Sequence, residues 1–203
     1  MTELAAAPVT VLLLGGGQGR RAGGPKALKI IIESGQLLWR VQRQAVLHDA
    51  VAVVAVLHPD AWRGPQAPGL GEIAVPADPE AEPFDSLQRG LRACDPRMPV
   101  AVLPVDCPWP GRDVLATLLH ASQVGNFTQL QLLAVRPQLA TPQGLRGGHP
   151  LLLLPPALPL LLDLNPKIAR LDHWLRDLGP RCCNVPVTDA AILANFNGDG
   201  FSR

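Results

Sequence analysis

The sequence predicts an α/β domain built on a parallel sheet, and three segments near its amino terminus carry that prediction. Val9–Leu14 is apolar at every position, which is typical of a strand covered on both faces. Gln36–His48 has apolar residues at helical spacing, and Ala50–Leu57 is a second apolar run. A strand, a helix and a strand in this order form a right-handed βαβ unit, and ligands bind at the edge where its strands end.

The later segments continue the alternation of apolar runs and amphipathic stretches. We expect further strands at Ala27–Ile32, Glu72–Ala77, Val100–Val105, Leu130–Val135, Leu151–Leu154 and Val185–Val187. Helices are expected at Asp85–Ala93, Arg112–Ser122, Ala157–Leu164 and Ile168–Leu178. Pro- and Gly-rich composition predicts loops at 61–70 and 137–145.

Size and composition favour one domain without a nucleic-acid partner. The 203 residues suffice for one sizeable core, and 47% of them are hydrophobic while only 17% are charged. The net charge of +1 provides no field that would attract a polyanion such as nucleic acid. We therefore expect a single domain over residues 1–203, with short tails at 1–8 and 198–203.

The sequence indicates neither export nor membrane insertion. The amino-terminal segment carries Glu3 and no basic residue before its apolar stretch, unlike a secretory leader. Prolines interrupt the leucine-rich run 151–164, which is shorter than the ~20 residues of a spanning helix. The four cysteines form no CxxC pair, and the adjacent Cys182 and Cys183 suit either buried small side chains or a metal or redox site. We expect a cytoplasmic protein with no membrane partner.

A glycine-rich loop with three basic residues follows the first strand. Gly15–Gly17 let the backbone approach an anion and present N–H donors to it, and Arg20, Arg21 and Lys26 supply positive charge. Polyphosphate sites need both, because oriented amides fix the geometry while cations neutralise charge. The pattern is not a P-loop, since Ala27 follows the lysine where a Ser or Thr is required.

Asp106 is a single acidic residue at the carboxyl end of the apolar run Val100–Val105. A carboxylate at this edge of an α/β sheet needs a partner cation, and Mg²⁺ characteristically uses one or two carboxylates together with substrate phosphates. The alternative is an N-cap for the helix Arg112–Ser122, but Gly111 and Asp113 place that cap further along the chain. We predict that Asp106 binds a metal ion.

These residues resemble a known family. The segment from Leu14 to Lys26, LGGGQGRRAGGPK, resembles the signature LAGGxSxRxGxxK of the MobA-like nucleotidyltransferases, which are related to the molybdenum cofactor guanylyl- and cytidylyltransferases. Arg21, Gly23 and Lys26 fall on family positions, and Asp106 with the two residues after it resembles the family's Asp-x-Pro metal motif. The departures are three small residues, at Gly15, Gly19 and Ala22.

The resemblance implies a fold and further site residues. The fold is a three-layer α/β/α Rossmann-like nucleotidyltransferase fold of the nucleotide-diphospho-sugar transferase type, with a mainly parallel sheet of about seven strands. Asp78 lies where guanylyl members place an aspartate near the base and ribose, although an acidic turn residue before proline is an equally good interpretation. His58 lies where the family contacts the base, or is a surface residue at a loop mouth.

The second half of the chain carries the residues that the resemblance assigns to the acceptor and to the metal. The Gly-His-Pro turn at His149 would orient an acceptor phosphate or hydrogen-bond a neighbouring loop, and Arg170 lies near a family Gly-Ala-Arg stretch that we assign to the acceptor. Asn195 and Asn197 resemble the family's closing Asn-x-Asn. There Asn197 would be a second metal ligand, but an amide carbonyl is weaker than a carboxylate.

The activity that the resemblance implies is Mg²⁺-dependent transfer of a nucleoside monophosphate from a nucleoside triphosphate to a phosphorylated small acceptor, releasing pyrophosphate. The acceptor implied is molybdopterin, and GTP is favoured over CTP. Catalysis would rest on Arg21, Lys26 and Asp106, and the nucleotide would contact Leu14, Gly15, Gly16, Gly17, Arg20, Arg21, Lys26, Asp78 and Asp106. Two alternatives remain: a sugar- or polyol-phosphate nucleotidyltransferase, and a nucleotide-binding or partner-docking module that has lost turnover.

Overall fold

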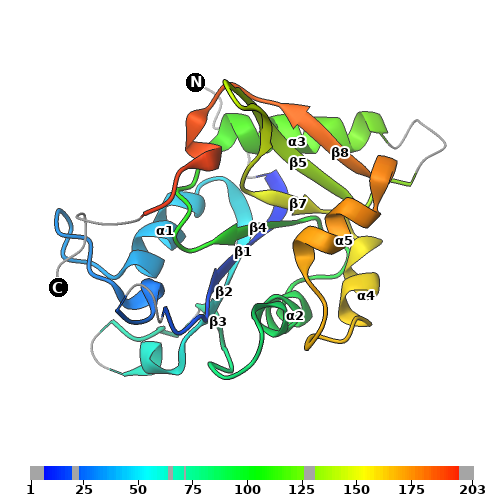
Figure 1. Cartoon of the computed structure of the whole chain (residues 1–203). Helices are drawn as coiled ribbons and strands as arrows, with labels where there is room; N and C mark the ends of the chain where they lie inside the picture. Colours follow the sequence, from blue (N-terminus) through cyan, green and yellow to red (C-terminus); the bar gives the residue numbers. More distant parts are fainter. Residues whose placement is uncertain (1–6, 20–22, 64–65, 71, 126–130, 197–203) are drawn as a thin grey trace.

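The computed structural model describes residues 7–19, 23–63, 66–70, 72–125 and 131–196. In this part of the chain, one sheet of eight strands is covered by helices on both faces (Figure 1). The predicted three-layer α/β/α fold is therefore confirmed, with eight strands instead of about seven.

The first half of the sheet is wholly parallel. Its strands are β1 (Ala7–Gly15), β2 (Ala50–Leu57), β3 (Ile73–Pro76) and β4 (Val100–Pro104), arranged in the order β3-β2-β1-β4. All four coincide with predicted strands. The apolar runs of β1, β2 and β4 are largely buried on both faces, whereas β3 is a partly exposed edge strand. Their carboxyl ends lie at one edge, as the βαβ prediction requires.

The second half of the sheet is mixed. It contains β5 (Ala134–Thr141), β6 (Gly144–Gly147), β7 (Leu151–Leu153) and β8 (Cys182–Pro186). Strand β7 runs antiparallel to both β4 and β5, whereas β8 runs parallel to β5. Taken together, six of the eight strands share one direction, and β6 and β7 oppose it.

Two predictions of local structure are wrong. The expected loop 137–145 is instead a hairpin in which β5 and β6 pair from Gln138–Gly147 to Thr141–Gly144, because cross-strand hydrogen bonds compensate for its Pro and Gly content. The expected strand Ala27–Ile32 begins with a 3₁₀ helix at Lys26–Leu28, and its one bridge joins Ile30 to Leu37. This segment has no neighbouring strand to extend it among the described residues.

The described residues include five α-helices, α1 to α5, and these form the outer layers (Figure 1). Helices α1 (Leu38–Val46) and α3 (Arg112–Gly125) pack on one face, around a core that contains the fully buried Trp39. Helices α2 (Pro83–Ala93), α4 (Ala157–Leu162) and α5 (Leu171–Asp177) cover the other face. Every one of these helices overlaps a predicted helix. No helix in the described ranges is long and apolar enough to cross a membrane.

Helix α2 approaches the sheet closely through a glycine, which gives the first testable prediction. A Cβ atom on Gly90 would lie 2.4 Å from Leu12 Cδ1 and 2.9 Å from Val56 Cγ2, both in fully buried side chains. Gly90→Ala should therefore lower the free energy of unfolding by about 1–2 kcal/mol, since overpacking outweighs the ~1 kcal/mol gain in helix propensity. Urea denaturation measures this difference.

The control variant is Gly69→Ala. A Cβ atom there would meet no described atom within 4 Å, so we expect a change within about 0.5 kcal/mol. An equal effect of both substitutions would contradict the close packing of α2 on β1 and β2.

Candidate functional site

The loop after β1 is shaped by glycines that admit no side chain. A Cβ atom on Gly16 would lie 2.3 Å from Ala77 Cβ and 2.9 Å from Ser86 Oγ. Gly19 has φ +59°, a conformation that favours glycine, and its carbonyl accepts a hydrogen bond from the Gly24 N–H at 3.1 Å. The loop is thus closed on itself beside β1. Arg20 and Arg21 lie outside the described residues, so their predicted contacts with phosphate stay a prediction.

A cavity of about 560 Å³ lies between this loop and the start of α2. Leu14, Gly16 and Gly17 form part of its wall, and Asp78 and Glu80 also line it. The structure therefore brings three predicted nucleotide-binding positions together with Asp78. The volume of the cavity falls within the ~300–1,000 Å³ range of small-molecule sites.

The mouth of this cavity is rich in carboxylates. Asp78 accepts a hydrogen bond from the Glu80 N–H at 3.0 Å, so it forms the expected turn and also lines the cavity. It also forms a distant ion pair with Arg89, at 3.8 Å. The Glu80 carboxylate accepts a hydrogen bond from the Gln18 amide at 2.5 Å, and Glu82 also lines the wall. Asp78, Glu80 and Glu82 therefore present carboxylate oxygens, which are hydrogen-bond acceptors, along this wall.

His58 has a local role in the structure. Its Nδ1 atom accepts a hydrogen bond from the Asp60 N–H at 3.3 Å, at the start of the 3₁₀ helix Pro59–Trp62. It does not line the 560 Å³ cavity.

A smaller hollow of about 160 Å³ joins the glycine loop to Asp106. Its wall includes Gly15, Gly17 and Gly19 together with Lys26 and Asp106. Lys26 Nζ lies 2.6 Å from Asp106 Oδ2, and the two side chains are 31% and 23% exposed. Residues separated by most of the first half of the chain therefore form one charged pair beside amide donors.

The backbone around Asp106 is held from two sides. The buried Gln42 on α1 donates its amide hydrogens to the carbonyls of Val105, at 3.0 Å, and Cys107, at 2.5 Å. On the sheet side, the Val105 N–H donates to the Leu14 carbonyl at 2.9 Å. Asp106 is not the N-cap of α3, which begins at Arg112. These hydrogen bonds hold the backbone that carries the Asp106 carboxylate in place. Gln42 is a residue that our sequence reasoning missed. The one available signal was a glutamine on an otherwise apolar helix face.

A segment near the C-terminus, residues 189–196, fastens the Asp106 loop to the Gly-His-Pro turn; we call it the C-terminal strap. The Phe196 N–H donates to the Asp106 carbonyl at 2.6 Å, and the Cys107 thiol donates to Asn195 Oδ1 at 3.1 Å. At its other end, the Ile192 carbonyl accepts a hydrogen bond from the His149 N–H at 2.9 Å. The predicted Asn-x-Asn segment therefore does approach Asp106. Asn197 itself lies outside the described residues.

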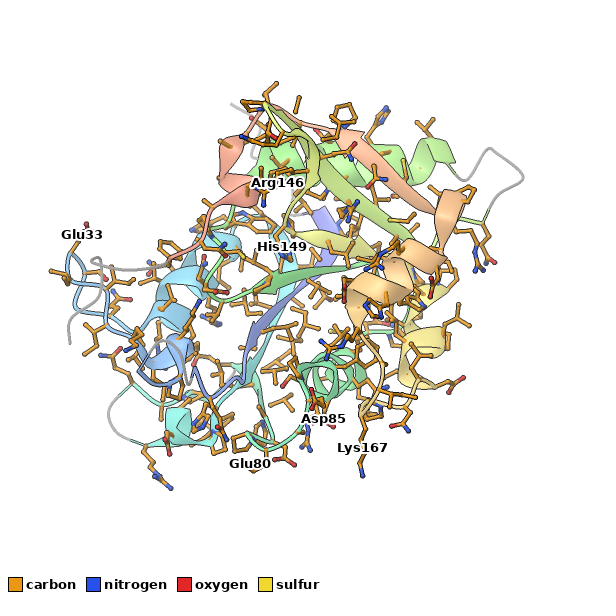
Figure 2. All side chains as sticks on the ribbon, viewed as in Figure 1. Glu33, Glu80, Asp85, Arg146, His149 and Lys167 are labelled. Carbon is orange, nitrogen blue, oxygen red and sulfur yellow. The ribbon has the colours of Figure 1, made fainter. Side chains whose placement is uncertain are left out.

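His149 is largely buried between these segments, and Figure 2 places it near the centre of the molecule. Burial lowers the pKa of the imidazole; the Arg136 charge lowers it further, while Asp106 opposes this. Its buried Nδ1 atom has no hydrogen-bond partner among the described residues. The side chain is therefore neutral near pH 7 and lies within electrostatic reach of Asp106.

Arg170 lies in a different hollow, of about 260 Å³, which it shares with Lys167. Leu14 and Glu82 line both this hollow and the 560 Å³ cavity, so the two are neighbours. His149 does not line either of them. The two predicted acceptor residues therefore stand apart in the structure.

The donor set at Asp106 fits a metal ion that is shared with a ligand. The described residues contain no group of three or more His, Cys, Asp or Glu side chains that could hold a metal alone. One partly exposed carboxylate beside an anion-binding loop suits the usual coordination of Mg²⁺, which keeps several water ligands and takes others from substrate phosphates. The residues present therefore fit a divalent cation that binds together with a phosphate ligand.

The support of Asp106 by Gln42 can be tested through the neighbouring thiol. Burial raises the pKa of Cys107 to about 12, and the Asp106 charge adds to this, so a thiol reagent should modify Cys107 far more slowly than an exposed cysteine. Gln42→Leu leaves two carbonyls without their donor and should speed the labelling of Cys107 by about tenfold or more. Peptide mass spectrometry measures the rate at this residue.

Gln88→Leu is a matched control. Gln88 is equally buried and donates to carbonyls at the end of α4, those of Leu161, Leu162 and Leu164. We expect a similar loss of stability in both variants but faster Cys107 labelling only in Gln42→Leu. Equal labelling in both would show that Gln42 does not hold this loop specifically.

Comparison with known proteins identifies the family of this chain. A family model described as the MobA-like NTP transferase domain matches residues 11–182. A search among curated proteins finds no match.

Several solved structures share the fold. A homologue of Mycobacterium tuberculosis Rv0371c from Mycobacterium sp. strain JC1 is similar with a TM-score of 0.69 and 19% identity, over 95% of this chain and 92% of that one. The manganese complex of Rv0371c from Mycobacterium tuberculosis H37Rv gives 0.63 and 19%, over 90% and 89%. The 2-C-methyl-D-erythritol 4-phosphate cytidylyltransferase of Thermus thermophilus gives 0.60 and 20%, over 90% of each chain. At these identities the similarity concerns the fold.

The family match covers most of the sequence and includes both the glycine loop and the carboxylate that faces it. The chain therefore belongs to the MobA-like NTP transferase family and is a nucleotidyltransferase.

Proposed function

We propose that this protein transfers a nucleoside monophosphate from GTP, in preference to CTP, to the phosphate of a small acceptor, with molybdopterin as that acceptor. The observation that carries the proposal is the Lys26–Asp106 pair in a hollow lined by the glycine loop. One cation, one carboxylate and several backbone donors at the end of a parallel sheet suit a triphosphate and its metal ion.

The loop and its cations would bind the triphosphate. Backbone N–H groups of Gly15–Gly17 supply fixed donors, and Lys26 neutralises charge that grows on the departing pyrophosphate. Arg20 and Arg21 are assigned to the same task by the sequence. Because these donors are already in place before the reaction, little reorganisation is needed in the transition state.

Asp106 would hold magnesium, with Asn197 as a further ligand. Held by Asp106, the ion would supply Lewis-acid polarisation of phosphate oxygens. Gln42 and the C-terminal strap keep the Asp106 backbone in one position, so the carboxylate does not have to be ordered when the ligand arrives.

The chemistry requires no covalent enzyme intermediate. Cys107 is the nucleophilic side chain next to Asp106, and its raised pKa keeps it a protonated thiol. Direct attack of the acceptor phosphate on the α-phosphorus, with pyrophosphate as the leaving group, is therefore the reaction that the site supports. Positioning and charge neutralisation are the main contributions of the protein to such transfers.

The acceptor-rich wall of the 560 Å³ cavity supports the preference for GTP. Guanine presents N–H donors at both N1 and N2, which match a carboxylate such as Asp78 in a bidentate arrangement. Cytosine offers only its 4-amino group on the corresponding edge. The carboxylates at this wall therefore favour the purine.

A sugar- or polyol-phosphate acceptor is the second candidate. The shared fold of the Thermus thermophilus cytidylyltransferase, whose name specifies a polyol phosphate, supports it. We further propose that residues 1–203 form a single domain and that the protein is cytoplasmic. The predicted tail 1–8 overlaps β1, which begins at Ala7.

The central test is Asp106→Asn. Pyrophosphate release is measured with Mg²⁺, each of the four NTPs, and either molybdopterin or 2-C-methyl-D-erythritol 4-phosphate. We expect the variant to lose at least about 100-fold in rate, because the amide is a poorer metal ligand, while the affinity for nucleotide changes little.

Asp95→Asn removes a carboxylate from a surface turn, where it pairs with Arg97, and should retain the full rate. An unchanged rate in Asp106→Asn would refute the metal assignment. Tight nucleotide binding without release with any acceptor would instead support a module that has lost turnover.

Base selection is tested by Asp78→Asn. If Asp78 accepts hydrogen bonds from guanine, the variant should bind GTP about 5- to 100-fold more weakly, a loss of about 1–3 kcal/mol, while CTP binding changes less than about twofold. Isothermal titration in the presence of Mg²⁺ measures both affinities. An equal loss for both nucleotides would assign Asp78 to the ribose instead of the base.

A further inference from the structure

A hydrogen bond between two side chains joins the opposite walls of the 560 Å³ cavity. The Gln18 amide in the glycine loop donates to the Glu80 carboxylate at 2.5 Å, and both residues line the cavity. They are 62 positions apart in the sequence, and Figure 2 shows Glu80 on the loop that leads from β3 to α2. A ligand that spans the two walls therefore meets this pair.

The backbone on each side of this hydrogen bond is held by local contacts. Gln18 precedes Gly19, whose carbonyl accepts the Gly24 N–H at 3.1 Å and closes the glycine loop. On the opposite wall, the Glu80 N–H donates to Asp78 Oδ1 at 3.0 Å. The Gln18 and Glu80 side chains can therefore exchange hydrogen-bond partners while the two walls keep their positions.

The carboxylates of Asp78 and Glu80 have partners in different directions. Asp78 Oδ2 lies 3.8 Å from an Arg89 nitrogen on α2, whereas Glu80 contacts the glycine loop through Gln18. Glu80 is thus the carboxylate on the side of the glycine loop. In the proposed nucleotide complex, Asp78 contacts the base and the glycine loop contacts the phosphates. The ribose joins these two parts of the nucleotide, so it lies next to Glu80.

We propose that Glu80 binds the 2′- and 3′-hydroxyl groups of the nucleotide ribose and selects nucleotides that carry them. This proposal rests on the proposed function and deepens it by assigning the recognition of the sugar. An ionised carboxylate has two acceptor oxygens, which suit two adjacent hydroxyl donors. Acidic side chains bind ribose hydroxyls in dinucleotide-binding sites for the same reason.

The hydrogen bond from Gln18 gives a physical reason for the selection. In the structure the Gln18 amide already donates to one Glu80 oxygen. A ribose hydroxyl can replace this donor, so the carboxylate keeps a hydrogen bond when the nucleotide binds. A sugar without hydroxyls displaces the amide and supplies no donor, which costs binding affinity. Because Glu80 is exposed, water compensates part of this loss, and we expect a discrimination of about tenfold.

The test compares GTP with 2′,3′-dideoxy-GTP, which lacks both hydroxyls. Isothermal titration with Mg²⁺ and without acceptor measures the two affinities. We expect the original protein to bind GTP at least about tenfold more tightly than the analogue. Glu80→Ala should reduce this ratio to less than about twofold, by weakening the binding of GTP. Glu80→Gln should give an intermediate ratio, because its amide carbonyl still accepts a hydrogen bond but carries no charge.

Glu33→Ala is the matched control. Figure 2 shows this exposed acidic residue far from Glu80, and it does not line the cavity. It should leave the ratio unchanged. Asp78→Asn should weaken both ligands by the same factor, because both carry guanine. Thermal unfolding of each variant shows whether it is folded. An unchanged ratio in Glu80→Ala, a ratio near one in the original protein, or a ratio lost in Asp78→Asn or Glu33→Ala would each overturn the assignment.

This outcome is separable from that of the proposed function. The same comparison with CTP and 2′,3′-dideoxy-CTP makes the result independent of the preferred base. A ratio that depends on Glu80 would support the assignment even if no acceptor gave pyrophosphate release. If nucleotides bind but the ratio does not depend on Glu80, the assignment is refuted and the proposed function stands. If no nucleotide binds at all, both are refuted.

Discussion

The parallel pairing of β1 with β4 is the constraint on which the rest of the site depends. The two strands are in register from Thr10–Val100 to Leu14–Pro104, and one further hydrogen bond joins Val105 to Leu14. This pairing carries the glycine loop and Asp106 to the same edge at the same height. A slip of one residue would turn the carboxylate to the opposite face of the sheet. The charged pair therefore follows from the register of two apolar strands.

Much of the fold could be predicted from local pattern. Strands β1, β2 and β4 are buried on both faces, and such burial requires an uninterrupted apolar run that is easily recognised in the sequence. The hairpin of β5 and β6 left none, because its residues alternate poorly and its stability comes from pairing with distant β8 as well as with each other. The short segment after Lys26 shows the opposite error, since β-branched residues alone do not make a strand without a partner.

The residues of the site likewise fall into those that the sequence could predict and those that it could not. Lys26 and Asp106 were predictable because each follows a strand that ends at the ligand edge, and a family signature marks both. Gln42 was not, because it acts through tertiary contacts that no spacing in the sequence encodes. Among the residues assigned from the resemblance, Asp78 lines the large cavity and His149 is within electrostatic reach of Asp106, while Arg170 lies in a separate hollow.

The direct contact between Lys26 and Asp106 has a consequence for how ligands enter. The two charges cancel each other at 2.6 Å, so a lone divalent cation meets a carboxylate that is already neutralised, and a lone phosphate meets an amine that is already engaged. A metal–triphosphate complex brings a cation for Asp106 and phosphate oxygens for Lys26. It can therefore replace both partners of the ion pair at once. In the proposed reaction the pocket therefore binds the metal–nucleotide complex in preference to a free metal ion or a metal-free nucleotide.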